Sequence, residues 1–258
     1  MIELNIQIEE LISKNATDFQ ISKVFKTYYK NYLDSIDTTV ETTGGKDFFI
    51  KHTKHTDKFL ILLYKYILRK NFGSHQPMST SIPISLIALG SYGREQLCIY
   101  SDIDIMVLYE NIKGYNLKDI MEEFITLAWD CGLKLGSRVH ELKEVSQAVK
   151  EDITIKSSIL ESRMIYGSKI LWFSYENILK VIRKTNQKEF VLEKLEEHKQ
   201  RLLKYPLKME PNIKDGYGGI RESNMMYWMA NIIYGATNTK DLIGTQFTED
   251  EYKKYRQS

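Results

Sequence analysis

The stretch from Leu89 to Glu110, LGSYGREQLCIYSDIDIMVLYE, places two aspartates at the start of a run with the composition of a buried strand. Side chains alternate between the faces of a strand, so Asp102 and Asp104 stand on the same face with their Cα atoms roughly 6.5 Å apart. Two carboxylates this close repel each other, and partial burial adds to the cost. A divalent cation with oxygen ligands resolves that conflict. The alternative is a polar strand end, or a turn cap after Ser101.

A glycine-serine turn precedes the aspartates by about ten residues. A strand that runs into Gly90-Ser91 lets backbone N–H groups and a hydroxyl face a phosphate at the start of the next helix. Arg94 then lies on that helix, where it can pair either with a phosphate or with an acid of the site. A triphosphate cradle so close to metal-binding carboxylates predicts a single nucleotide site.

The elements expected around this stretch make the chain helix-rich, with a small sheet near its middle. Apolar residues at every second position favour a strand, and apolar residues at spacings of three and four favour a helix. We therefore expect an α+β fold with a small mixed sheet flanked by helices, and with additional helices on both sides. The expected strands are 84–89, 102–109 and 135–139, the expected helices are 4–33, 54–71, 117–131, 144–150, 153–166, 187–204 and 220–234, and 38–46 is expected as a loop.

Three regions follow from this pattern. We expect an N-terminal helical region over residues 1–75, a catalytic core over 76–145 and a second helical region over 146–258. The last region contains the glycine-rich loop Asp215–Gly219, which leads into its final long helix.

Composition limits the class of protein. The 258 residues are 43% hydrophobic and 27% charged, and 36 basic against 34 acidic residues give a net charge of +2. A balance this close does not indicate a nucleic-acid partner. Cys98 and Cys131 form no metal-binding or disulfide pattern. The longest apolar block, Phe59–Leu68, is too short to span a bilayer, so we expect a cytoplasmic protein without a membrane partner.

The motifs of the chain resemble a known family. Gly90-Ser91 followed by Ser101–Asp104 is similar to the signature of DNA polymerase β-like nucleotidyltransferases, which implies their core fold. The fuller string resembles, more narrowly, the bifunctional uridylyltransferases of the PII nitrogen-signal protein. Trp129–Gly136, Asp152–Gly167 and Glu210–Glu222 support the narrower resemblance, which covers most of residues 50–250.

This resemblance implies roles for individual residues. Asp102 and Asp104 would be catalytic and would ligate Mg²⁺ or Mn²⁺, and two groups of residues would bind the nucleotide. The first group surrounds the aspartates and the second lies around the glycine-rich loop: Gly90, Ser91, Arg94 and Ser101, then Lys214, Gly218, Gly219 and Arg221.

The glycine-rich loop also has features that favour anion binding, independently of the family resemblance. Gly218 and Gly219 open a helix whose N-terminus can face an anion, with Lys214 and Arg221 beside it. The alternative is a packing turn between two helices.

The chain departs from the family pattern at two points. Many polymerase β-like enzymes carry a third carboxylate on a neighbouring strand. Here no strand acid clearly faces the aspartate pair, and Glu141 is one candidate and Glu161 another. His140 occupies a position where the family tends to have arginine, which would make a phosphate contact there weaker or pH-dependent.

The resemblance implies transfer of UMP from UTP to a tyrosine of the PII protein, with release of pyrophosphate. Two other hypotheses remain open. One is a stand-alone nucleotidyltransferase acting on a toxin, an RNA or a small molecule, and the other is a non-catalytic nucleotide-binding regulator. Enzymes of the family also remove uridylyl groups with a His-Asp metal domain. This sequence has no His-Asp dipeptide, so we expect a fragment of a longer protein, with a naturally short paralogue as the alternative.

Overall fold

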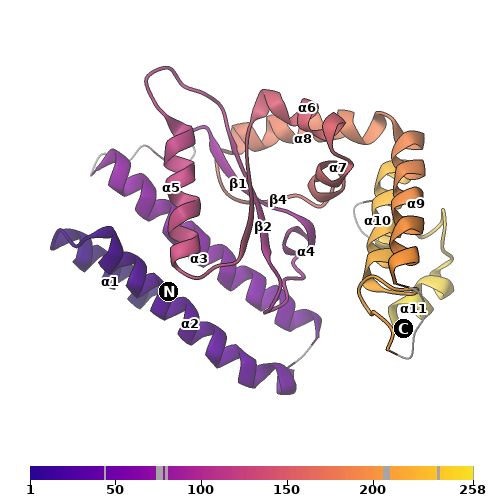
Figure 1. Ribbon diagram of the computed structural model, residues 1–258, viewed down its shortest axis with the longest axis horizontal. Coiled ribbons are helices and arrows are strands. Elements are labelled where there is room, and N and C mark those ends of the chain that lie inside the picture. The colour runs from indigo at the N-terminus through magenta and orange to yellow at the C-terminus, as the bar shows by residue number, and fades with distance from the viewer. Residues whose placement is uncertain (44, 74–77, 79–80, 206–209, 237–238, 258) are drawn as a thin grey trace. The chain divides into compact units, whose positions relative to one another are not determined.

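The computed structural model describes residues 1–43, 45–73, 78, 81–205, 210–236 and 239–257. It is a mixed α+β chain built around one small sheet (Figure 1), as expected. In chain order the elements are α1 (Ile2–Ser13), α2 (Asp18–Thr43), α3 (Lys46–Phe72), β1 (Ile84–Ala88), α4 (Gly90–Gly93), β2 (Ile103–Tyr109), α5 (Leu117–Asp130), β3 (Leu135–Glu141), η1 (Leu142–Glu144), α6 (Val145–Glu151), α7 (Ile153–Ile159), β4 (Arg163–Gly167), α8 (Lys169–Lys184), α9 (Gln187–Lys204), α10 (Ile220–Tyr234), η2 (Thr239–Leu242) and α11 (Glu249–Gln257).

The sheet has the strand order β3-β2-β1-β4. β1 runs antiparallel to both β2 and β4, while β2 and β3 are parallel. Parallel neighbours require a crossover connection, and α5 supplies it. Asn116 caps α5 as expected, because its side chain accepts a hydrogen bond from the Asp119 amide at 3.4 Å.

The alternation of side chains along β2 determines which face of the sheet is covered. Ile103, Ile105 and Val107 are at most 4% exposed and pack into a core with residues of α1, α2, α3 and α5. Phe59 of α3 and Phe124 of α5 are fully buried in that core. Figure 1 shows α3 and α5 alongside the sheet. Asp104 therefore faces the opposite side of β2.

The N-terminal helices differ from the expectation in two places. The helix expected over 4–33 is two helices, because the chain turns at Asn15, whose φ is +52°, and Thr17 begins a new cap with Gln20. The loop expected over 38–46 is wrong, since α2 continues to Thr43 and α3 begins at Lys46. The helix propensity of threonine is only modestly lower than that of alanine, so a threonine-rich run can still be helical.

A further difference lies beside the sheet. The helix expected over 153–166 ends at Ile159, and Arg163–Gly167 forms β4 instead. β4 pairs with the second edge of β1, with Ala88 opposite Arg163. Gly167 has a φ of +117°, which favours glycine. The pairing is long-range, so local periodicity could not reveal it.

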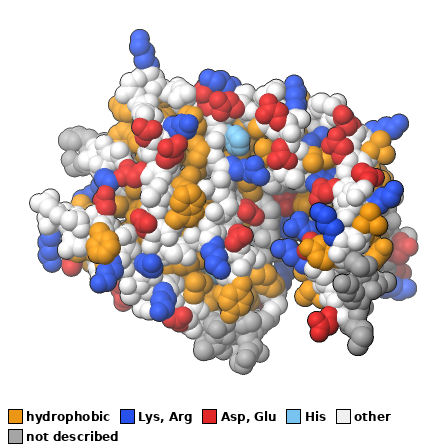
Figure 2. Space-filling model, viewed as in Figure 1, with side chains coloured by type: hydrophobic (Ala, Val, Ile, Leu, Met, Phe, Trp, Pro, Cys, Tyr) orange, Lys and Arg blue, Asp and Glu red, His pale blue; other side chains and the backbone are white. Residues whose placement is uncertain are grey.

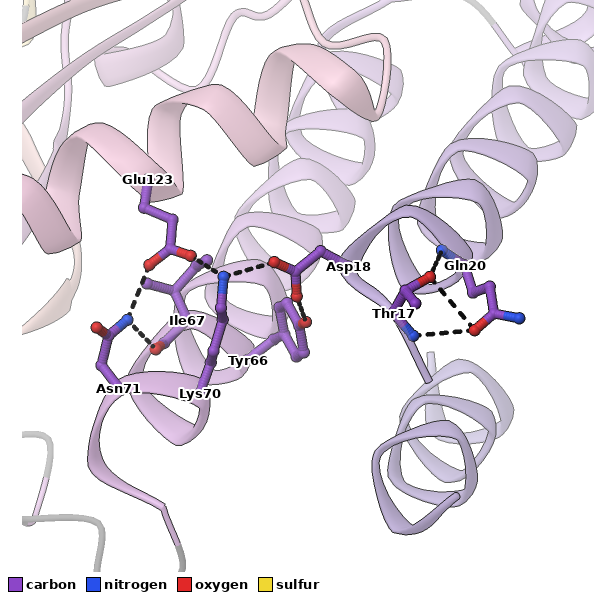
Figure 3. Close-up of polar contacts among 8 residues, drawn as sticks. All are labelled: Thr17, Asp18, Gln20, Tyr66, Ile67, Lys70, Asn71 and Glu123. Carbon is purple, nitrogen blue, oxygen red and sulfur yellow. Dashed lines mark hydrogen bonds and ion pairs between the residues drawn. The ribbon is translucent and has the colours of Figure 1, made fainter. Parts of the chain in front are cut away.

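Polar contacts tie α2 and α5 to α3 (Figure 3). Lys70 of α3 lies between Asp18 of α2, at 2.5 Å, and Glu123 of α5, to which it is also ion-paired. The Tyr66 hydroxyl donates to the second oxygen of Asp18 at 2.7 Å. These groups are partly exposed, so each ion pair contributes on the order of 1 kcal/mol or less.

The chain forms two compact units. The first comprises residues 1–147 and 161–175, and the second comprises 148–160 and 176–258. The second unit has its own small core of Leu160, Phe190 and Ile232, against which Trp228 packs. None of the helices in the described ranges combines the length and the apolar composition needed to cross a bilayer. Lys/Arg and Asp/Glu side chains are interspersed over the face shown in Figure 2, in keeping with the net charge of +2.

Candidate active site

The two aspartates lie at the beginning of β2. Asp102 immediately precedes the strand and is exposed, while Asp104 is its second residue and is half-buried. The amide of Ile103 between them donates to the Lys134 carbonyl at 2.8 Å, which ties this end of β2 to the segment before β3. Because Ile103 is buried in the core, the neighbouring aspartates stand on the other face of the strand.

The glycine-serine turn lies directly against Asp104. The Leu89 amide donates to the Asp104 carbonyl at 2.9 Å, and the next residue, Gly90, begins α4 with a φ of +55°. A Cβ atom at Gly90 would lie 3.5 Å from Oδ2 of Asp104. Glycine is therefore favoured here by its backbone conformation, and it leaves the space beside the carboxylate open.

A second glycine stands on the other side of the same carboxylate. Gly136 of β3 is the parallel partner of Asp104 in the sheet. A Cβ atom at Gly136 would collide with Oδ1 of Asp104. The Asp104 carboxylate thus lies between Gly90 and Gly136, and neither of these two neighbours carries a side chain.

The other residues expected near the triphosphate have different surroundings. Ser91 and Ser101 are half-buried, Ser91 in α4 and Ser101 directly before Asp102. Arg94 is ion-paired with Glu161, whose side chain is 1% exposed, and its Nε donates to Gln96 at 3.1 Å. Arg94 is therefore paired with an acid, and its contact with a phosphate stays a prediction.

The two candidates for a third carboxylate have cationic partners. Glu161 pairs with Arg94, and Glu141 pairs with Lys143 at 2.8 Å. Glu141 also lies five residues beyond Gly136 on β3, which is roughly 16 Å along the strand. The structure therefore does not bring Glu141 to Asp104.

His140 also lies away from the aspartates. It is opposite Leu108 in the sheet, four residues beyond Gly136. Burial and the nearby Arg138 lower the pKa of His140. Its Nε2 is buried without a hydrogen-bond partner among the described residues. A lowered pKa favours the neutral imidazole, and the weaker or pH-dependent phosphate contact expected at His140 stays a prediction.

The glycine-rich loop belongs to the second unit, and its backbone groups are largely satisfied within the loop. The amides of Ile220 and Arg221, at the start of α10, donate to the carbonyls of Ile213 and Lys214 at 3.0 and 3.1 Å. The Gly218 amide donates to a carboxylate oxygen of Glu222 at 2.8 Å. These contacts support the packing-turn alternative for the start of α10.

The side chains of the loop differ in their availability. Nε of Arg221 is ion-paired with Asp215 at 2.7 Å, whereas Lys214 is exposed. A Cβ atom at Gly219 would meet the Gly216 carbonyl oxygen at 2.8 Å, so glycine is needed there for close packing. Lys214 is thus the member of this group whose charge is most accessible.

The chain is similar to known proteins over most of its length. A family model described as GlnD PII-uridylyltransferase matches residues 189–258. The chain is 35% identical over 256 residues to a bifunctional uridylyltransferase/uridylyl-removing enzyme of Hydrogenovibrio crunogenus, an alignment that covers 93% of this chain and 28% of that protein. The chain belongs to this family.

Other family members give similar values. The bifunctional uridylyltransferase/uridylyl-removing enzymes of Ectopseudomonas mendocina and Pseudomonas entomophila are 34% and 36% identical over 67% and 64% of this chain. These alignments cover 20% and 19% of the two enzymes. The chain therefore spans less than a third of these uridylyltransferase/uridylyl-removing enzymes. The resemblance drawn from the motifs is confirmed.

Sequence reasoning missed two features of the site. One is Gly136, although a glycine inside a predicted strand is itself a signal of close backbone approach. The other is a set of contacts that hold α4, made by Asp57, Tyr92 and Arg163. These three residues are far apart in sequence, so no local pattern could have joined them.

Proposed function

We propose that this chain carries a metal-dependent nucleotidyltransferase activity that moves UMP from UTP to a protein acceptor of the PII type and releases pyrophosphate. The position of Asp104 carries this proposal. Asp104 follows Asp102 by two residues, and its carboxylate lies between Gly90 and Gly136. The names of the relatives support the uridylyl group. A cytoplasmic location remains part of the proposal.

The residues present fit Mg²⁺ or Mn²⁺. Asp102 and Asp104 offer only oxygen donors, which these hard cations prefer. Within the described part of the chain, no group of three or more His, Cys, Asp or Glu side chains could hold a metal. A pair of carboxylates such as Asp102 and Asp104 suits Mg²⁺, which is commonly held by one or two carboxylates and the phosphates of the substrate. The bound cation would neutralise negative charge on those phosphates.

The protein groups around the aspartates would bind and orient the triphosphate. We assign phosphate binding to the turn at Gly90 and Ser91, with Ser101 beside Asp102. Arg94 would support the turn through its ion pair with Glu161. This arrangement would act mainly by positioning, which is the main contribution of the protein to nucleotidyl and phosphoryl transfer.

The second unit would contribute through Lys214. Its charge is accessible, so we propose that it attracts a phosphate, while Arg221 supports the loop through Asp215. Gly218 and Gly219 would shape the loop, and the internal hydrogen bonds of its backbone argue against a large part in anion binding.

The test is transfer of label from α-³²P UTP to a purified PII-type protein, with ATP, GTP and CTP as matched controls. The proposal predicts label on the acceptor with UTP and Mg²⁺, and none with EDTA. Label on another protein, an RNA or a small molecule would favour a stand-alone enzyme. Nucleotide binding without transfer to any acceptor would favour the non-catalytic regulator.

A further inference from the structure

Tyr92 connects the glycine-serine turn to the centre of the first unit. It follows Ser91 in α4, is fully buried, and its hydroxyl donates to Oδ1 of Asp57 in α3 at 2.6 Å. Burial and the neighbouring Asp57 raise the pKa of Tyr92 well above its ordinary value. The hydroxyl therefore stays protonated and remains a donor at every pH at which the protein would work.

Arg163 of β4 joins the same carboxylate. Its Nη1 and Nη2 donate to the two oxygens of Asp57 at 2.9 and 3.0 Å, a bidentate arrangement that fixes geometry as well as charge. Nη2 also donates to the Tyr92 carbonyl at 3.4 Å, and the guanidinium carbon lies 5.5 Å from the centroid of the Tyr92 ring. Asp57, Tyr92 and Arg163 therefore form one network, which links α3, α4 and β4.

The last residue of α4 is held from a second direction. A Cβ atom at Gly93 would collide with the backbone carbonyl oxygen of Glu161, so α4 lies directly against the segment before β4. The following residue, Arg94, is ion-paired with the Glu161 side chain. The end of α4 is thus fixed by close packing and by an ion pair.

The start of α4 is the part that lies against Asp104. Leu89 is hydrogen-bonded to the Asp104 backbone, and Gly90 faces the Asp104 carboxylate. Only Ser91 separates Gly90 from Tyr92. A shift of Tyr92 would therefore move Gly90 and Ser91 relative to Asp104.

We propose that Asp57, Tyr92 and Arg163 are positioning residues that fix the glycine-serine turn relative to Asp104. The inference rests on the proposed function and adds the part of the protein that keeps its nucleotide site in place. The three residues act through the turn, and the nucleotide itself would be bound by the turn and the aspartates.

The chain offers a matched control for the Tyr92 hydroxyl. Tyr66 is also a buried tyrosine of the first unit whose hydroxyl donates to an aspartate, Asp18, at 2.7 Å (Figure 3). Tyr66→Phe and Tyr92→Phe each remove one hydroxyl and one bond to a carboxylate. The Tyr66 hydroxyl bonds to Asp18 of α2, whereas Tyr92 is itself part of α4, so we expect only Tyr92→Phe to disturb the turn.

The experiment measures three quantities in the full chain: the melting temperature, hydrogen exchange of the amides at 90–96, and kcat and KM for the nucleotide. We expect Tyr92→Phe to lower the melting temperature at least as much as Tyr66→Phe, because Asp57 is more buried than Asp18, so activity is compared at a temperature at which both variants are folded. Tyr92→Phe should exchange faster at 90–96 and lose kcat/KM by about tenfold or more, as expected when reacting groups are misplaced. Tyr66→Phe should match the unaltered chain in both respects. Asp57→Asn, which removes the charge that Arg163 binds, should resemble Tyr92→Phe.

The outcomes separate this inference from the proposed function. If the unaltered chain transfers nucleotide and Tyr92→Phe and Asp57→Asn keep its kcat/KM, the network is structural and the inference is overturned. An equal loss of kcat/KM in Tyr66→Phe would also overturn it, because the effect would then be general destabilisation. If the unaltered chain transfers no nucleotide, the proposed function fails, and the positioning role fails with it.

Discussion

Gly136 of β3 lies beside Asp104 of β2 in the parallel register, and a Cβ atom at Gly136 would collide with the Asp104 carboxylate oxygen Oδ1. The atom that would be displaced is the end of a rotatable side chain. The backbone can therefore stay in place while the carboxylate moves. Gly136 preserves the position of the carboxylate more than the stability of the sheet.

Gly136→Ala should therefore separate activity from stability. We expect nucleotidyl transfer to fall by about tenfold or more, because the carboxylate is displaced, while the free energy of unfolding changes by about 0.5 kcal/mol or less. Gly93→Ala is the control, since there the collision is with the Glu161 backbone. Overpacking should cost that variant about 1–3 kcal/mol.

Urea unfolding and the transfer assay, run on both variants, check this expectation. Full activity in Gly136→Ala would mean that the Asp104 carboxylate has no fixed position in the reaction. A stability loss in Gly136→Ala as large as that in Gly93→Ala would mean that Gly136 is required for the fold itself.

Nucleotide binding should depend on a divalent cation. Asp102 and Asp104 would repel a triphosphate unless a cation lies between them. Calorimetry with UTP should show clear binding in Mg²⁺ and much weaker binding in EDTA, and Mn²⁺ should restore it. Equal affinity in EDTA would argue against a metal site at the two aspartates.

Two basic residues of the glycine-rich loop should respond differently to substitution, one in UTP binding and the other in melting temperature. Lys214→Ala should weaken UTP binding by about 1.5–3 kcal/mol, the range for a hydrogen bond to a charged group, without lowering the melting temperature. Arg221→Ala should lower the melting temperature, because it breaks the ion pair with Asp215. Unchanged affinity in Lys214→Ala would assign the whole loop to packing.

Two histidines of α3, the buried His52 and the half-buried His55, should make the stability of the first unit depend on pH. His52 is 2% exposed and accepts or donates a hydrogen bond with Tyr32 at 2.9 Å, and the Tyr32 ring stacks on His55 with centroids 3.4 Å apart. Burial lowers the pKa of both histidines from 6.5 to about 4. In the folded chain they are therefore neutral at pH values where the unfolded chain is protonated.

Because the unfolded chain binds these protons more readily than the folded chain, the free energy of unfolding falls as the pH falls. The contribution to stability is complete above pH 6.5 and is lost as the pH falls from 6.5 through about 4. For His52 alone the loss amounts to about 3 kcal/mol. Urea midpoints at pH 7, 5.5 and 4.5 should decrease, and His52→Asn should reduce the slope. Parallel slopes for the two proteins would show that His52 does not contribute.

Local patterns predicted the parts of the fold that local physics decides. The alternation around Asp104 predicted β2, and the Asn116 cap predicted the start of α5. β4 could not be predicted, because Arg163–Gly167 becomes a strand only by pairing with β1. Periodicity over 153–166 was therefore misleading in its second half.

In the candidate site, too, the residues close in sequence were predicted and the residues brought in by long-range contacts were not. Gly90 and the two aspartates are close in sequence, and their motif indicated their chemistry directly. Gly136 enters the site through the β2–β3 register, and Asp57 enters through the fold of α3. Arg94 had two possible partners in the sequence, and only the tertiary structure identified Glu161.

Whether Asp102 and Asp104 carry nucleotidyl transfer is tested by transfer from UTP in Mg²⁺ with the variants Asp102→Asn and Asp104→Asn. Each variant keeps the size of the side chain and removes the charge that a cation needs. With melting temperatures near that of the unaltered chain, we expect both variants to lose transfer almost completely, by about 100-fold or more. Transfer retained by either folded variant would contradict the assignment of the site.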